Sequence, residues 1–153
     1  MTTGEWIGQI CGVLIVVVMV ITMQLPKRWQ MLCGNAVLNL LSTVNQFLVG
    51  SGFAACLVCG LATIHCPFNA YKVKKGKPIT MTENIVWTIL YLVAWGIGAA
   101  IPLMNGAFSP MDLFPLLSTF CYFGTVFCAR ERDIRLCSFA NSFVYFIYDG
   151  IAF

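Results

Sequence analysis

The sequence predicts an all-α integral membrane protein with six transmembrane helices, from its composition, its apolar runs and the positions of its charges. Hydrophobic residues make up 59% of the 153 residues and charged residues only 10%, whereas a soluble domain typically carries about 25% charge. So few charged side chains cannot cover a surface in water, and most of the surface is expected to face lipid. Runs such as "VLIVVVMVIT" lack the alternation of membrane β-strands, which favours helices.

Six apolar stretches are long enough to cross the hydrocarbon core, which takes about 20 helical residues. Turns such as "PKRWQ", "NGAFSP" and "RERDI" separate them. The leader "MTTGEW" carries an acid and no base, so the first stretch is expected to be a membrane helix, not a signal peptide. Small residues in "GSGFAA" and "WGIGAA" predict close packing of helix backbones. The expected spans are 6–25, 31–49, 53–71, 84–104, 113–129 and 135–153.

The basic residues predict how these helices are oriented. All of them lie in the turns after the first, third and fifth spans, which six crossings place on one side of the membrane. The opposite side carries only the acids Glu5 and Asp112. By the positive-inside rule, the basic loops are expected in the cytoplasm and the N-terminus outside. The nine basic residues are Lys27, Arg28, Lys72, Lys74, Lys75, Lys77, Arg130, Arg132 and Arg135.

The first two spans resemble the last two, which indicates an internal repeat. A shift of 104 positions superimposes spans 1 and 2 on spans 5 and 6 without a gap and aligns their charged turns. Because three spans separate the two repeat starts, the units are parallel in the membrane, an arrangement known among transporters. The aligned pairs are Arg28 with Arg132, Leu32 with Leu136, Cys33 with Cys137, Ala36 with Ala140, and Asn45 with Asp149.

Two long stretches resemble a known bacterial family. They are "KRWQMLCGNAVLNLLSTVNQFLVGSGFAACLVCGLATIHC" and "DLFPLLSTFCYFGTVFCARERDIRLCSFANSFVYFIYDG". Their common features are a charged break after span 1, a polar residue before the Gly turn after span 2, the "D-L-x-P-L-L" opening of span 5, and "R-L…Y-[ND]-G" in span 6. In these features the chain resembles the bacterial inner-membrane YgjV family, which implies a multi-pass protein of the bacterial inner (plasma) membrane.

The layout is also similar to the SWEET and PQ-loop superfamily, in which a linker helix joins two parallel three-helix bundles. That plan has a seventh helix, which a partner or a second copy of the chain would supply unless the chain is shortened. The Pro-Gln pair of PQ-loop proteins is absent, since Gln24 precedes Pro26. The similarity implies one membrane domain, 1–153, comprising a first bundle at 1–72, a cytoplasmic loop at 73–83, a linker helix at 84–104 and a partial second bundle at 111–153 that lacks its third helix.

Polar side chains form one stripe along span 2 and another along span 6. Their spacing of three to four residues places each set on one helix face, and polar groups in hydrocarbon normally face a bundle interior or a wet cavity. We therefore predict that the stripes line a substrate path; alternatively, they act only as contacts between helices, each worth about 0.6–2 kcal/mol. The candidate path residues are Asn35, Asn39, Ser42, Asn45, Asn141, Tyr145 and Asp149.

Three residues are candidate gates. His65, the sole histidine, precedes Pro67, which removes a backbone hydrogen bond and kinks a helix. A titratable ring beside a kink suits proton-linked gating. Asp149 is the only acid clearly inside a predicted span and would pair with a cation or proton, or gate the outer mouth. The alternatives are an interface histidine that contacts backbone or headgroups, and a solvated carboxylate.

Enzyme, metal and nucleic-acid functions find little support in the sequence. There is no Ser/His/Asp set, no H-E-x-x-H motif and no Gly-rich phosphate loop. Cys56 and Cys59 form C-x-x-C inside an apolar helix without the further ligands that a metal needs, so the eight cysteines are expected to pack as small apolar residues. We expect no enzyme activity, no cofactor, and basic loops that contact lipid headgroups.

Two functions therefore compete. The first is a small-solute membrane transporter of SWEET-like plan, which works by alternating access on a substrate that the sequence does not identify. The second is a non-transporting membrane scaffold, assembly subunit or receptor, in which the polar stripes are contacts between helices. A continuous polar cavity would favour the transporter, and a dry, fully packed axis would favour the scaffold.

Overall fold

Every regular element of the computed structural model is a helix, within the residues that it describes, and this confirms the predicted all-α class. The structure describes residues 3–49, 53–106, 113–128 and 130–152. Within the helices, some side chains lie outside this description, among them those of Tyr145 and Asp149. The helices are α1 (Thr3–Gln24), α2 (Arg28–Val49), α3 (Phe53–Lys74), α4 (Met81–Met104), α5 (Phe114–Phe127) and α6 (Glu131–Ala152).

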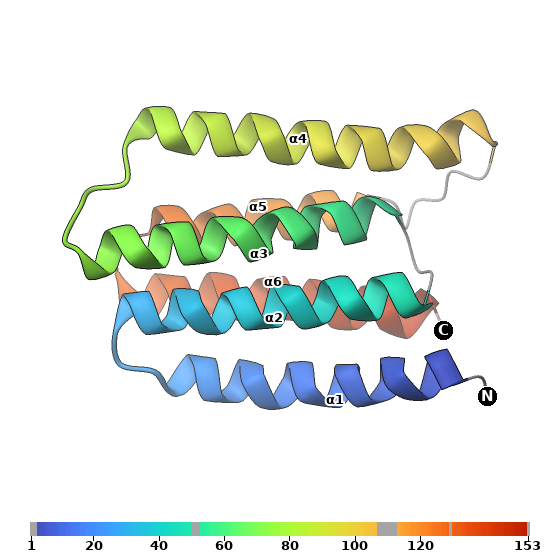
Figure 1. Ribbon diagram of the computed structural model, residues 1–153, viewed down its shortest axis with the longest axis horizontal. Coiled ribbons are helices and arrows are strands. Elements are labelled where there is room, and N and C mark those ends of the chain that lie inside the picture. Colours follow the sequence, from blue (N-terminus) through green and yellow to red (C-terminus); the bar gives the residue numbers. More distant parts are fainter. Residues whose placement is uncertain (1–2, 50–52, 107–112, 129, 153) are drawn as a thin grey trace.

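The helices run roughly parallel or antiparallel to one another (Figure 1). α3 lies at the centre and packs against α2, α4 and α5, while α1 packs on α2 and α6 packs on α5. The α1–α2, α3–α4 and α5–α6 connections lie at one end of the bundle (Figure 1). The first turns of α6 contact the α1–α2 connection there, since Nη2 of Arg135 donates to the carbonyl oxygen of Leu25 at 3.3 Å. The three charged turns of the sequence thus share one end.

The helices overlap the six predicted spans, and several extend into the charged turns. α2 begins at Arg28 and α6 at Glu131, because long charged side chains at a helix end reach polar surroundings. α5 is shorter than the predicted 113–129 span: its 14 residues rise about 21 Å, less than the hydrocarbon core of about 30 Å.

Capping and an ion pair fix the connection between α3 and α4. The Thr80 hydroxyl accepts the Glu83 N–H at 3.3 Å, and a Glu83 carboxylate oxygen accepts the Thr80 N–H at 2.9 Å. This reciprocal capping box satisfies N–H groups that a helix start leaves unpaired. Nζ of Lys72, near the end of α3, also donates to the Glu83 carboxylate at 2.6 Å. The turn closes at Gly76, whose φ of 66° suits glycine.

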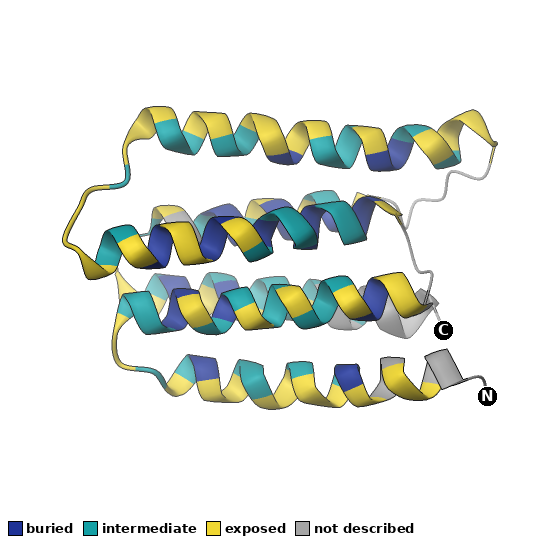
Figure 2. Cartoon of the chain, in the orientation of Figure 1, coloured by how far each residue is buried: buried dark blue, intermediate teal, exposed yellow. Residues whose placement is uncertain are grey.

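The outer faces of α1 and α4 are exposed and apolar (Figure 2). Soluble proteins rarely expose contiguous apolar surface beyond a few hundred Å², so these faces suit lipid. Exposed members include Val13, Val16, Val17, Val20 and Ile21 on α1, and Ile85, Val86, Ile89, Val93 and Ile97 on α4.

By length and composition, two helices of the described chain are apolar enough to cross a membrane, α3 and α4. α6 begins with the charged residues Glu131, Arg132 and Asp133, and α2 carries the polar stripe. Six crossings and two repeated bundles therefore stay predictions.

Candidate functional site

A cavity of about 720 Å³ lies between α1, α2, α5 and α6. Its volume falls within the range of small-molecule sites, about 300–1,000 Å³. α2 and α6 meet at one of its walls, where Nδ2 of Asn35 donates to Oγ of Ser138 at 3.4 Å. The polar residues of its lining are Asn35, Asn39, Ser42, Asn45, Gln46, Tyr122, Thr125, Ser138, Asn141 and Ser142.

The structure brings the two predicted stripes to the same cavity. The spacing along α2 places its polar residues on one face, and that face is turned toward α6. Two further candidates, Tyr145 and Asp149, have side chains outside the described residues, so their part in a path stays a prediction. The candidate path residues that line the cavity are Asn35, Asn39, Ser42, Asn45 and Asn141.

The polar lining is partly satisfied by the protein itself. Nδ2 of Asn39 donates to the Asn35 carbonyl oxygen at 2.8 Å, and the Ser118 hydroxyl on α5 donates to Oδ1 of Asn141 at 2.5 Å. Oδ1 of Asn45, in contrast, is buried and has no hydrogen-bond partner among the described residues. This oxygen has almost no accessible surface, so it is a buried acceptor beside the cavity and not a group that the cavity exposes.

Apolar side chains complete the lining. α1 contributes Val13, Val16 and Met19, and α6 contributes Phe139 and Phe143. All of these except Met19 are also exposed at the outside of the bundle, so the cavity is open on that side. None of the described lining residues is charged. The site can therefore surround a small uncharged molecule with apolar contacts and direct amide and hydroxyl groups at its polar atoms.

His65 lies outside this lining, in a second polar cluster between α3, α4 and α5. Its side chain is 1% exposed, and its Nε2 lies 2.7 Å from Nδ2 of Asn69. Its Nδ1 lies 3.3 Å from the Tyr122 hydroxyl and 3.4 Å from the Tyr91 hydroxyl. The ring stacks on Trp87 with centroids 4.1 Å apart. Its described contacts are thus buried side chains rather than the backbone or headgroups of the alternative interpretation.

Pro67, the other predicted gate on α3, is exposed, whereas His65 is buried. α3 stays helical from Phe53 to Lys74 with Pro67 inside it. The two residues are thus on different sides of the helix, and a hinge at Pro67 stays a prediction.

The sequence reasoning missed the partners of His65. A partial signal was present, because Trp87 and Tyr91 are four residues apart and must share a face of α4. Asn69 is likewise four residues from His65. Nothing in the sequence, however, says which face of α4 packs on α3, or that Tyr122 of α5 joins them.

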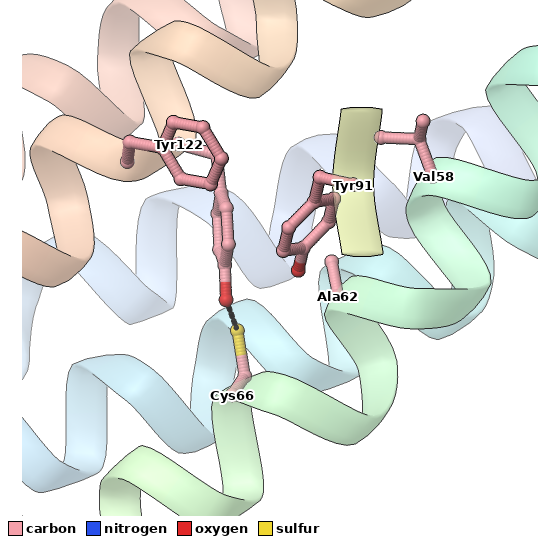
Figure 3. Packing of buried hydrophobic residues seen from close by; sticks show 6 residues of the cluster. Val58, Ala62, Cys66, Tyr91 and Tyr122 are labelled. Atoms are coloured by element: carbon pink, nitrogen blue, oxygen red, sulfur yellow. Dashed lines mark hydrogen bonds between the residues drawn. The ribbon is translucent and has the colours of Figure 1, made fainter. Parts of the chain in front are cut away.

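Tyr122 connects the cluster to the cavity. Its hydroxyl lies 3.0 Å from Sγ of Cys66 on α3, with the Tyr91 hydroxyl nearby (Figure 3). Nδ2 of Asn39 donates to the same sulfur at 3.8 Å. Since Tyr122 and Asn39 both line the cavity, a chain of polar contacts runs from His65 to its wall.

Metal ligands do not gather in the described part of the chain. No group of three or more His, Cys, Asp or Glu residues is placed to hold a metal ion there. Cys56 and Cys59, the C-x-x-C pair, both lie on α3, and Cys59 is buried.

The exposed apolar faces of α1 and α4 are typical of a membrane protein. A family model described as Imp-YgjV, bacterial inner membrane protein, matches residues 6–152. The chain belongs to this family of bacterial inner membrane proteins. No curated protein and no solved structure matches the chain.

Proposed function

We propose that this protein is a small-solute transporter of the bacterial inner membrane that works by alternating access. The observation that carries the proposal is the cavity of about 720 Å³, into which polar side chains project from both α2 and α6. Polar side chains inside a membrane bundle are costly unless they pair with one another, with water or with a ligand. Transporters commonly place their substrate site at such an interface between repeated units.

The chemistry of the lining supports an uncharged or weakly polar solute. Amides and hydroxyls can donate and accept hydrogen bonds, and the described lining offers no charge to neutralise an ion. Asn45 adds a buried acceptor without a partner among the described residues. Removal of a solute's polar atoms from water is therefore offset by these groups.

In this proposal the bundle crosses the membrane six times. The charged turns at one end of the bundle face the cytoplasm by the positive-inside rule. Helix α1 then begins, at Thr3, on the outer side of the membrane. Two parallel bundles of SWEET-like plan would rock about the cavity. A partner chain or a second copy would supply the helix that completes the second bundle.

A non-transporting scaffold has its own support. The hydrogen bonds from Asn35 to Ser138 and from Ser118 to Asn141 join helices directly, as polar contacts between membrane helices do. In that case the cavity would be filled by lipid or by a partner and would hold no water.

Thiol labelling in lipid nanodiscs separates the two functions. All native cysteines would be replaced except Cys66, which is 0% exposed. A single new cysteine would then be introduced at Ser42 or at Asn141. A membrane-impermeant maleimide is expected to label both positions, because water fills the cavity. Matched controls at Val37 and Leu40, exposed on the outer face of α2, should stay unlabelled in lipid. Protection of Ser42 and Asn141 to the same extent as Val37 would support the scaffold and contradict transport.

A further inference from the structure

The His65 cluster contains a buried titratable ring that the cavity itself does not use. Two ionisable side chains contact the ring, Tyr91 on α4 and Tyr122 on α5, and a third, Cys66 on α3, contacts the Tyr122 hydroxyl. Its other neighbours, Asn69 and Trp87, are uncharged. No carboxylate or basic group is among its described contacts, so the cluster is not an ion pair.

The hydrogen bonds around the ring depend on where its protons are. As placed, Nδ2 of Asn69 lies 2.7 Å from Nε2 of His65, and Oδ1 of Asn69 is buried without a partner among the described residues. A rotation of the amide presents Oδ1 to Nε2, so that the neutral ring can carry its proton on Nε2 and donate it to this oxygen. Nδ1 of the neutral ring then accepts from the Tyr122 or Tyr91 hydroxyl. A second proton on the ring is therefore taken up at Nδ1, the nitrogen that faces the tyrosines.

Other neighbours also suit a charged ring. A hydroxyl oxygen of Tyr122 or Tyr91 can accept the Nδ1 proton while its own proton points elsewhere. Trp87 stacks on the ring with an interplanar angle of 18°, a geometry that favours a cation over an indole face. The site can therefore hold the neutral and the protonated ring without a carboxylate.

Protonation of the ring would reach the cavity through Tyr122. When Nδ1 donates to the Tyr122 oxygen, the hydroxyl proton is free to point at Sγ of Cys66, 3.0 Å away. The same sulfur accepts from Asn39 at 3.8 Å. A change in the ring therefore alters the partners of two residues of the cavity lining, Tyr122 and Asn39.

We propose that His65 is a proton-binding site and that its protonation controls the cavity through Tyr122, Cys66 and Asn39. The control of the cavity rests on the proposed transport function, whereas the proton site does not. The proton is taken from cavity water, and no covalent step other than N–H formation is involved. A buried charge is costly, so the protonated ring is a state that acidification populates.

The proton site can be observed directly because His65 is the sole histidine. Protein labelled with ¹⁵N-histidine, purified without a histidine tag and placed in nanodiscs, gives ring signals from His65 alone. On acidification these signals should pass reversibly from neutral to protonated ring, while circular dichroism shows intact helices. Asn69→Leu and Tyr122→Phe should each shift the midpoint. The proton site would be overturned if the ring stays neutral until the helices unfold. It would also be overturned if both variants have the same titration midpoint as the parent protein.

The coupling is tested by a matched pair, Tyr122→Phe and Tyr91→Phe. Each removes a hydroxyl near Nδ1 of His65, but Tyr122 also has a hydrogen bond to Cys66 and lines the cavity. The readout is the rate at which maleimide labels a cysteine introduced at Ser42. At each pH this rate is divided by the rate measured for the same cysteine in a protein that also carries His65→Gln. The ratio of the two rates is then independent of the pH dependence of the reagent. Acidification should change this ratio several-fold in the parent and in Tyr91→Phe, but not in Tyr122→Phe.

Each other result has a definite meaning. A ratio that is independent of pH in the parent, or equal responses of the two tyrosine variants, would overturn the coupling. If Tyr122→Phe does not fold, Cys66→Ala breaks the same chain of contacts and should give the same loss. Absence of labelling at Ser42 at every pH would overturn the coupling and the proposed function together, and the histidine titration would still decide the proton site.

Discussion

Asn45 places a buried amide oxygen at the cavity with no hydrogen-bond partner among the described residues. Leaving a buried acceptor unsatisfied costs about 1–3 kcal/mol. If the cavity holds water, a rotation of the Asn45 side chain can bring this oxygen to a water molecule, and that cost disappears. The state of this one oxygen therefore reports whether the cavity is wet.

The substitution Asn45→Leu tests whether the cavity is wet through its effect on the free energy of unfolding. In a wet cavity, the substitution removes a satisfied amide, and we expect no gain in stability. In a dry cavity, it removes an unsatisfied acceptor, and stability should rise by about 1–3 kcal/mol. Thermal unfolding in a fixed detergent would measure the difference, and a gain of that size would contradict the wet cavity.

At the scale of helices, close packing depends on small residues at particular positions. Gly98 of α4 lies against Ala54 of α3, since a methyl group at Gly98 would come within 2.3 Å of the Ala54 Cα. A methyl group added at Gly96, two residues away, would have no such atom within 4 Å. The "WGIGAA" pattern thus contains one glycine that α3 contacts and one that it does not.

Gly98→Ala is expected to destabilise the protein by about 1–3 kcal/mol, because the contact is with backbone that cannot move aside locally. Gly96→Ala is the matched control and should cause no loss, since alanine favours helices over glycine. Unfolding monitored by circular dichroism would compare the two. Equal effects of the substitutions would contradict the packing of α4 on α3.

The α5–α6 pair offers a substitution that a second change should repair. A methyl group at Gly124 of α5 would lie 2.5 Å from Sγ of Cys137 on α6 and 3.3 Å from its Cβ. Gly124→Ala should therefore lower the unfolding temperature, and Gly124→Ala with Cys137→Ala should recover most of the loss, because the sulfur is gone. Independent, additive effects of the two changes would mean that the residues are not in contact.

At the scale of the whole molecule, the charged turns lie at one end of the bundle (Figure 1). By the positive-inside rule, we expect this end to face the cytoplasm. A single cysteine at Lys77, between α3 and α4, should be labelled by an impermeant maleimide only from the cytoplasmic side. A cysteine at Asn105, at the opposite end of α4, should be labelled only from outside. Labelling of both from one side would contradict the proposed orientation of α4.

The sequence predicted most of the fold and one wall of the cavity, for identifiable reasons. Apolar runs and charged turns mark each helix, and the spacing of Asn35, Asn39 and Ser42 identifies the polar face of α2. The partners of His65 could not be predicted, because they come from three helices whose relative rotation is set by packing. α5 begins one residue after the start of the predicted 113–129 span and ends at Phe127, and residue 129 lies outside the described residues.

The measurement that tests the central claim most directly is the sidedness of labelling at Ser42. A single cysteine there would be exposed to impermeant maleimide in right-side-out and in inverted membrane vesicles, with Lys77 and Asn105 cysteines as controls for each side. Alternating access predicts that Ser42 is labelled from both sides, although each control is labelled from only one. Labelling of Ser42 from a single side, or from neither, would contradict a path through the membrane.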